Sequence, residues 1–265
     1  MNESARAIGR VRHEPKRRLL SVTAWEDVTP KMRRISLGGP DLEGFVSAAP
    51  DDHVKLFFPM PDGRIVLPEL GPNGPSFPEA MRPQARDYTP RRYDPIAGRL
   101  DIDFVLHGDG PASNWAANVA IGRQIGLGGP RGSFVIGAFD YYLLVGDETA
   151  LPAIGRRIEE LPAGARVIAL VEIADAGEEQ LFATAAQLDL RYFHRDGAAP
   201  GTTQLLQQAV ETLELPGGTG FHFVAGEAQM VRDLRALLVD RRGIDPDHLR
   251  ASAYWHLGIA DAHEH

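Results

Sequence analysis

The first half of the chain, up to about residue 137, carries short alternating apolar stretches that are broken by Gly, Pro and Asp. A period of two is typical of strands with one buried face, and frequent turn residues are typical of antiparallel sheets. The clearest stretches lie at 19–25, 32–37, 53–58 and 100–106. In the last of these, Asp101 and Asp103 alternate with apolar residues, which predicts one buried face and one mixed face. We expect a small antiparallel barrel.

One short helix is expected within this half, over residues 111–120, because Pro111 suits a first helical turn. A glycine-rich segment follows at 126–132. The stretch 69–80 is rich in Gly, Pro and Asn, which predicts an exposed loop between strands.

After Ala138 the pattern changes to strands and helices in alternation, with strands expected at 141–145, 167–173, 191–193 and 221–224. The clearest helix is expected over 227–241, where apolar residues recur at helical spacing and Gly243 lies near the expected end. Alternation of this kind is typical of a parallel sheet covered by helices. The sequence therefore predicts an antiparallel β-barrel domain at 1–138 and an α/β domain with a parallel sheet and a C-terminal tail at 139–265.

Composition narrows the possible chemistry. The chain of 265 residues contains no cysteine, which excludes disulfides, thiolate nucleophiles and iron–sulfur clusters with cysteine ligands. No apolar run approaches the ~20 residues that span a bilayer, and residues 1–18 lack the apolar centre of a signal peptide. We therefore expect no membrane span and a cytoplasmic location, and any redox chemistry requires a bound cofactor.

Charge is distributed unevenly along the chain. The net charge is −8, but residues 1–138 contain 18 Lys and Arg against 16 Asp and Glu, whereas the remainder contains 10 against 20. An acidic protein is a poor candidate for nucleic-acid binding. The first half can still accept an anionic ligand.

The segment Arg86-Asp87-Tyr88-Thr89-Pro90-Arg91 is the most informative motif. On one continuous strand, Arg86 and Tyr88 would share a face and Thr89 and Arg91 the other, unless Pro90 introduces a bulge. Arginine binds phosphate oxygens, tyrosine lies against flat rings, and a threonine hydroxyl reaches a ring nitrogen. The set suits a flat ligand with a phosphate tail, although a solvated basic strand with a packed tyrosine explains these six residues equally well.

The second motif runs from His107 to Trp115, where a strand is expected to end and a helix to begin. Backbone N–H groups at such a helix start attract phosphate. Ser113 occupies the place of the third glycine of a dinucleotide-binding G-x-G-x-x-G motif, so that motif is rejected. The alternative is an ordinary helix start with Trp115 in the core. Together, the two motifs favour FAD.

The chain resembles the siderophore-interacting, or ferric-siderophore reductase, family within the ferredoxin-reductase-like flavoproteins. The resemblance extends over nearly the whole chain through ordered motifs. These are residues 52–59, 86–91, 107–115, 129–133, 145–153, 225–227 and 254–255.

The resemblance implies an FAD-binding barrel followed by a nicotinamide-type α/β domain. It also implies that Thr89 tunes the flavin and that no protein side chain acts as acid or base. The implied flavin ligands are Arg86, Tyr88, Thr89, Arg91, His107, Gly110, Ala112 and Ser113.

In the second half, Asp147 and Thr149 lie where a strand is expected to end and a helix to start. They either contribute to a nicotinamide site or cap the helix. Acidic side chains there repel a pyrophosphate, and the acidic stretch 174–179 offers no arginine for a 2′-phosphate. The electron donor stays open between NADPH, NADH and reduced ferredoxin.

Ferric siderophores are commonly anionic, so Lys55 and Arg131 are the candidate substrate-binding residues. The alternatives are an exposed strand lysine for Lys55 and a turn residue for Arg131. Tyr254 and Trp255 either shield a flavin or pack the C-terminus. The histidines of the 263–265 tail are not expected to bind a metal, because chain ends are usually mobile.

The expected function is FAD-dependent reduction of a ferric siderophore, with NAD(P)H or reduced ferredoxin as donor and release of Fe(II). Two alternatives share these motifs. One is a siderophore-binding or iron-delivery flavoprotein without efficient turnover, and the other is a general flavin reductase or electron carrier.

Overall fold

A computed structural model describes residues 8–71, 74–78, 81–108 and 110–258 of the chain. By their contacts these residues form two compact units. The first unit is Arg10–Phe134, and the second comprises Ile8, Gly9 and the described residues from Val135 onward.

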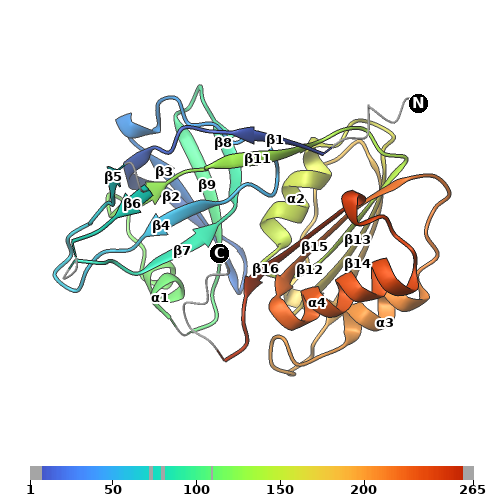
Figure 1. Ribbon diagram of the computed structural model, residues 1–265. Helices are drawn as coiled ribbons and strands as arrows, with labels where there is room; N and C mark the ends of the chain where they lie inside the picture. The colour runs from blue at the N-terminus through green and yellow to red at the C-terminus, as the bar shows by residue number, and fades with distance from the viewer. Residues whose placement is uncertain (1–7, 72–73, 79–80, 109, 259–265) are drawn as a thin grey trace. The chain divides into compact units, whose positions relative to one another are not determined.

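The first unit is built on a seven-stranded antiparallel sheet with the strand order β7-β4-β10-β2-β3-β9-β8 (Figure 1). The strands are β2 (Arg17–Thr29), β3 (Met32–Gly38), β4 (Val54–Phe57), β7 (Ala85–Tyr88), β8 (Pro90–Asp94), β9 (Arg99–Val105) and β10 (Gln124–Gly128). Helix α1 (Pro111–Ala117) and a 3-10 turn at Pro40–Leu42 also belong to this unit. The sheet is an antiparallel half-barrel, and the antiparallel β-domain predicted for this half is confirmed.

Alternation in the strands produces the core of this unit, as the sequence predicts. Leu20, Leu56, Ile102 and Leu127 are fully buried and pack in one cluster with Trp115 of α1. Burial of each such side chain contributes about 1.5–3 kcal/mol.

The expectation of a mixed second face on β9 is wrong, because Asp101 and Asp103 are also buried. Both carboxylates have polar partners. Ser36 Oγ donates to Asp101 at 2.7 Å, and Arg34 donates to both oxygens of Asp103 at 2.7 and 2.8 Å. These partners compensate the cost of removing the charges from water.

Two short ladders are separate from the main sheet. Strand β1 (Ile8–Arg12) pairs with β11 (Gly132–Ile136). Within the stretch predicted as a loop, β5 (Glu69–Gly71) pairs with β6 (Gly74–Ser76). Part of this stretch is therefore an antiparallel strand pair, which the sequence did not predict because its residues do not alternate between apolar and polar.

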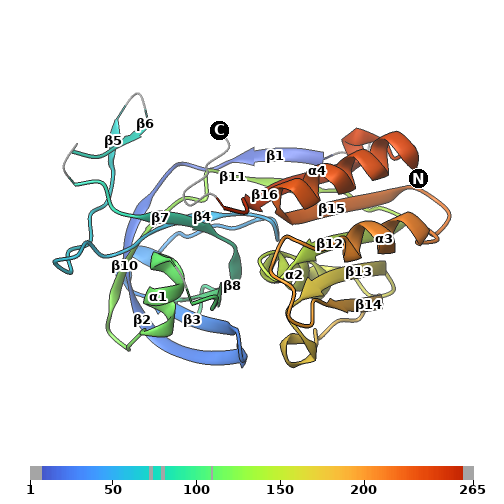
Figure 2. The same ribbon diagram turned by 90° about the horizontal axis from the view of Figure 1, so that it is seen from below.

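The second unit has a five-stranded parallel sheet with the order β14-β13-β12-β15-β16. Its elements are β12 (Tyr141–Asp147), α2 (Leu151–Glu160), β13 (Arg166–Ile173), β14 (Gln187–His194), α3 (Leu205–Thr212), β15 (Gly220–Glu227), α4 (Ala228–Ala236) and β16 (Leu249–Trp255), with 3-10 turns at Ala176–Glu178 and Pro246–His248. Figures 1 and 2 show α3 and α4 on one face of the sheet and α2 on the other. The predicted parallel α/β architecture is confirmed.

Three elements of this unit differ from the sequence expectation. Strand β14 has eight residues where three were expected, and β16 was not predicted as a strand. The helix expected over 227–241 begins one residue later, because Glu227 is its N-cap and accepts hydrogen bonds from the N–H groups of Gln229 and Met230. After Ala236 it continues as a π-helical turn, Leu237–Arg241.

Candidate functional site

The motif at 86–91 lies where the two edges of the first sheet are joined by the chain. Arg86 and Tyr88 belong to β7, which pairs with β4, whereas Arg91 belongs to β8, which pairs with β9 at the opposite end of the strand order. Thr89 is the single residue between them. The register shifts between Pro90 and Arg92. The bulge named as an exception in the sequence reasoning is therefore present, and simple strand alternation does not describe the motif.

Thr89 and Arg91 are both buried at this junction. Arg91 Nε lies 3.7 Å from Asp103 Oδ2, and Asp103 also accepts both hydrogen bonds from Arg34. Hydrogen bonding to Asp103 raises the pKa of Arg34. One buried carboxylate thus fixes two guanidinium groups beside the motif.

Tyr88 packs in a series of aromatic rings that leads to α1. Its ring centroid lies 4.4 Å from that of Phe104, which lies 5.7 Å from that of Trp115. Burial raises the pKa of Tyr88, so its phenol stays neutral. The indole Nε1 of Trp115 is buried and has no hydrogen-bond partner among the described residues.

Backbone geometry and a hydroxyl shape the second motif. Gly110 has φ 85° and precedes Pro111, and no side chain caps α1. The left-handed conformation explains the glycine. Ser113 Oγ accepts a hydrogen bond from the N–H of His107 at 3.1 Å, so the helix holds the start of the loop that follows β9. Ala112 and Ser113 are buried.

The two candidate substrate-binding residues differ in their contacts. Lys55 Nζ forms an ion pair with Asp87 Oδ1 at 2.8 Å, and both side chains are partly exposed. Arg131 is exposed, and its backbone carbonyl accepts a hydrogen bond from His13. The ammonium of Lys55 is therefore partly compensated by a residue of the 86–91 motif.

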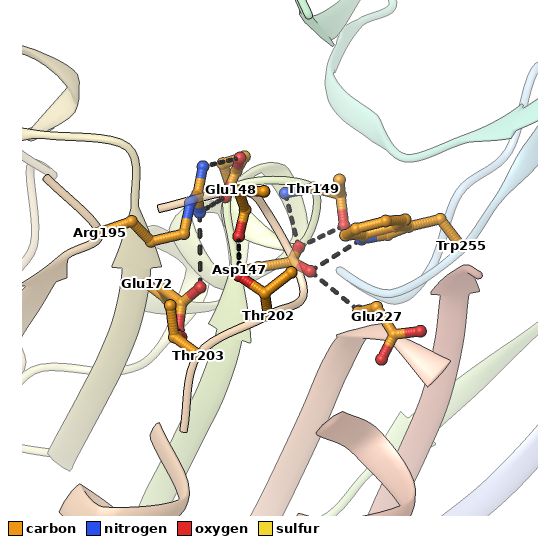
Figure 3. A network of polar contacts seen from close by, with 10 residues as sticks. Asp147, Glu148, Thr149, Glu172, Arg195, Thr202, Thr203, Glu227 and Trp255 are labelled. Atoms are coloured by element: carbon orange, nitrogen blue, oxygen red, sulfur yellow. Dashed lines mark hydrogen bonds and ion pairs between the residues drawn. The ribbon is translucent and has the colours of Figure 1, made fainter. Parts of the chain in front are cut away.

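In the second unit, a polar network gathers at the carboxyl edge of the parallel sheet (Figure 3). Asp147 Oδ1 accepts from the N–H and the hydroxyl of Thr149, at 2.9 and 2.5 Å. Asp147 Oδ2 accepts from the N–H of Glu227 and from Nε1 of Trp255, both at 2.8 Å. Burial and the neighbouring Glu148 raise the pKa of Asp147 to about 6.

The second part of the network is an ion cluster around Arg195. Its guanidinium donates to both oxygens of Glu148 at 2.6 Å and lies 3.6 Å from Glu172. Thr203 Oγ1 donates to Glu172 at 2.5 Å. Asp147, Thr149 and Arg195 are thus engaged with protein groups, and Arg195 is paired with two carboxylates, those of Glu148 and Glu172.

Comparison with known proteins identifies the chain. Residues 21–134 match the siderophore-interacting FAD-binding domain and residues 139–258 match the siderophore-interacting protein model. The chain is 36% identical over 260 residues to the NADPH-dependent ferric-chelate reductase of Escherichia coli, with 97% of this chain and 99% of the relative covered. The chain belongs to the siderophore-interacting protein family.

Two further relatives agree with this assignment. The ferric vibriobactin reductase ViuB of Vibrio cholerae is 34% identical over 247 residues, covering 91% of this chain and 90% of that protein. A siderophore utilization protein from T. fusca has a solved structure with a TM-score of 0.92 and 42% identity, covering 97% of this chain and 98% of that chain. The family and the FAD-binding barrel expected from the sequence are confirmed.

The residues of the first unit fit the FAD that this family's first domain binds. Arg86, Tyr88, Thr89 and Arg91 supply donors along the junction of β7 and β8, and the buried indole N–H of Trp115 has no acceptor among the described residues. Donors of this kind suit a ligand with phosphates and ring nitrogens. The fit to FAD therefore rests on the donor groups of these side chains and on the burial of Thr89, Arg91 and the Trp115 indole N–H.

Arg195, Glu172 and Thr203 were missed by the sequence reasoning. Arg195 follows β14, and Glu172 lies at the end of β13. A signal was present, because residues that follow parallel strands gather at one edge of the sheet. Which of these residues contact one another depends on the order of the strands in the sheet, and no local sequence pattern specifies that order.

Within the described residues, no helix is long and apolar enough to cross a membrane. No group of three or more His, Cys, Asp or Glu residues there is arranged to hold a metal ion. The tail 263–265 lies outside the described residues.

Proposed function

We propose that this protein is an FAD-dependent ferric-siderophore reductase. The observation that carries the proposal is the full-length similarity to reductases of ferric complexes, combined with a first unit whose donors fit FAD. FAD, when bound, converts the two-electron chemistry of a nicotinamide into one-electron reduction of iron. One NAD(P)H then reduces two Fe(III) to two Fe(II), with release of NAD(P)⁺ and a proton.

The residues of the first unit divide the work of holding FAD. We assign phosphate contacts to Arg86, to Ser113 and to the first turn of α1 at Ala112, with Gly110 and His107 shaping the approach. Tyr88 contributes a flat, neutral ring, and the Thr89 hydroxyl contributes a hydrogen bond to the flavin ring. Arg91 contributes mainly through Asp103, which fixes its guanidinium.

We assign the electron donor to the NADPH class, because the Escherichia coli relative carries that donor in its name. Asp147 and Thr149 would then shape the donor site indirectly, since their contacts are with Glu227, Trp255 and each other. Reduced ferredoxin is the alternative donor. NADPH and reduced ferredoxin are both cytoplasmic electron donors, so we place the reductase in the cytoplasm.

We also assign Lys55 and Arg131 to the recognition of an anionic ferric siderophore. Lys55 is 32% exposed and Arg131 is exposed, so both side chains are accessible to a substrate. Positive charge near the reducing site raises the local concentration of an anion even on an acidic protein.

The test is steady-state trapping of Fe(II) by ferrozine with FAD-loaded protein. Ferric siderophores of different charge are combined with NADPH, NADH and reduced ferredoxin. We expect turnover with at least one donor, and siderophore binding without turnover with every donor would contradict the proposal. Turnover of free flavin that exceeds turnover of every ferric siderophore would favour a general flavin reductase.

Variants locate the cofactor site in the same assay. Arg86→Gln and Ser113→Ala should loosen FAD, whereas Thr89→Val should retain FAD and change its reduction rate. Arg92→Gln is the matched control, because Arg92 is an exposed arginine of β8, the next strand along the chain. Equal FAD occupancy in Arg86→Gln, Ser113→Ala and Arg92→Gln would contradict the phosphate contacts proposed for Arg86 and Ser113.

A further inference from the structure

Three neighbouring strands of the first unit place two cations in one row. Gly128 of β10 is aligned with Arg17 of β2 on one side and with Lys55 of β4 on the other. Aligned residues on neighbouring strands project to the same face of a sheet. With strands about 4.8 Å apart, the Cα atoms of Arg17 and Lys55 are separated by about 10 Å.

This row lies on the outer face of the half-barrel. The next residues along the three strands, Arg18, Leu56 and Leu127, are buried on the core side. Arg17 is exposed, and the Lys55 side chain is 32% exposed. Both cations are therefore accessible to a ligand in solution.

The residue between the two cations in this row is Gly128, which has no side chain. A Cβ added at Gly128 would lie 3.2 Å from Cε2 and 3.5 Å from Cζ of Phe57. The Phe57 ring thus lies against the glycine, and Phe77 packs against Phe57 with ring centroids 5.6 Å apart. A larger residue at position 128 would displace this ring, so the space between the two cations is filled by a buried apolar ring and holds no competing charge among the described residues.

The two cations differ in how far they are compensated. Lys55 pairs with Asp87, which is aligned with it on β7. Arg17 donates one hydrogen bond, from Nη1 to the carbonyl of Pro68 at 2.9 Å. Among the described residues no carboxylate forms an ion pair with Arg17. An arginine has five N–H donors, so most of this guanidinium is available to a ligand.

We propose that Arg17 is a further substrate-recognition residue, which acts with Lys55 across Gly128 on a ferric siderophore that carries separated anionic groups. Asp87 limits the attraction exerted by Lys55 and thereby sets the selectivity for substrate charge. This inference rests on the proposed function. It adds Arg17 and Asp87 as determinants of specificity, and neither reacts with the substrate.

The test uses two synthetic hexadentate iron(III) complexes as probes, a trianionic tris(catecholamide) and a neutral trihydroxamate. Arg17→Gln removes the charge and keeps an N–H donor for Pro68. At low salt its KM for the trianionic complex should rise about three- to tenfold, because a partly exposed charge contact is modest. Its kcat and its KM for the neutral complex should stay unchanged, and added salt should shrink the difference.

Arg123→Gln is the matched control, because Arg123 is also exposed and donates from Nη1 to one carbonyl, that of Asn118. It should leave both KM values unchanged. Asp87→Asn should lower the KM for the trianionic complex, since it releases Lys55. Thermal unfolding of each variant is measured as well, because loss of the hydrogen bond from Arg17 to the Pro68 carbonyl would lower stability, whereas loss of a substrate contact would not.

The gallium(III) complexes of the same ligands, which are not readily reduced, measure binding without turnover. A wild-type protein that reduces no ferric complex would contradict the proposed function, while selective loss of trianionic gallium binding in Arg17→Gln would still support the inference. Equal effects of Arg17→Gln on both complexes, or an effect no larger than that of Arg123→Gln, would overturn it. Lower thermal stability without a selective change in KM or gallium binding would also overturn it, because Arg17 would then only hold Pro68.

Discussion

Arg195 shows how a single residue holds the carboxyl edge of the parallel sheet together. Its side chain is 3% exposed and contacts Glu148 and Glu172. Burial alone lowers the pKa of an arginine, but the hydrogen bonds to Glu148 raise the pKa of Arg195 overall. Removing one partner of a buried ion cluster leaves the others uncompensated, which costs more than the cluster contributes.

We therefore expect Arg195→Met to lower the free energy of unfolding by about 3–5 kcal/mol, because two carboxylates lose their cation. Arg191→Met is the control, since Arg191 pairs with Asp189 while both side chains are about half exposed. Its effect should stay below about 1 kcal/mol. Urea unfolding followed by circular dichroism measures both values. Similar values for the two variants would contradict this role of Arg195.

Two buried residues of the second unit give stability opposite dependences on pH. Asp147 has a folded pKa of about 6, above its ordinary 3.8, so its contribution is present at low pH and is lost as pH rises through 6. Burial lowers the pKa of His222 to about 4, below its ordinary 6.5. Its contribution is present above pH 6.5 and is lost as pH falls toward 4.

The two contributions oppose each other between pH 4 and 6, so single variants should separate them. His222→Gln should make the free energy of unfolding fall more steeply with rising pH than in the wild type. Asp147→Asn should change the slope in the opposite direction, whatever its effect on absolute stability. Guanidinium unfolding at several pH values from 4 to 7 measures the slopes. Parallel curves for the two variants would refute the assignment.

At the scale of elements, Gly146 allows β12, β15 and α2 to approach closely. A Cβ at this position would lie 2.5 Å from the carbonyl oxygen of Ala225 and 2.6 Å from Cβ of Ala150. Ala225 belongs to β15, and Ala150 is the N-cap of α2. The approach brings the start of α2 against the end of β12, where Asp147 follows.

Gly146→Ala should therefore destabilise the protein by about 1–3 kcal/mol, because backbone and helix must shift to admit one methyl group. Gly217→Ala is the control, since a Cβ there meets nothing within 4 Å and the backbone needs no positive φ. That change should stay within about 0.5 kcal/mol of the wild type. Differential scanning calorimetry compares the two, and equal melting temperatures would show that α2 adapts without cost.

At the scale of the whole molecule, the two units match separate family models, and the FAD-binding model covers 21–134. A ligand that binds the folded state stabilises the part of the protein it contacts, by about 2.7 kcal/mol at a hundredfold excess over its Kd. FAD should act through the first unit.

Addition of FAD should therefore slow hydrogen exchange in residues 85–94 and 106–117, where the proposed ligands lie. Helices α3 and α4 of the second unit provide the internal control and should change little. Mass spectrometry with and without saturating FAD measures the effect. Stronger protection of residues 205–212 and 228–236 than of the first unit would place the cofactor elsewhere.

The sequence by itself determined the local elements and the class of cofactor. Alternation in 100–106 and helical spacing in 227–241 are local signals, because a pleated strand repeats every two residues and a helix every 3.6. The motifs at 86–91 and 107–115 pointed to FAD through side-chain chemistry that needs no fold.

The tertiary structure decided which distant residues meet. Asp101 and Asp103 are buried because Ser36 and Arg34 lie opposite them on β3. Arg195 binds Glu148, 47 positions away, and Gly128 separates Arg17 from Lys55 only because β10 lies between β2 and β4. These contacts depend on strand order, which is set by the packing of the whole sheet rather than by any local repeat.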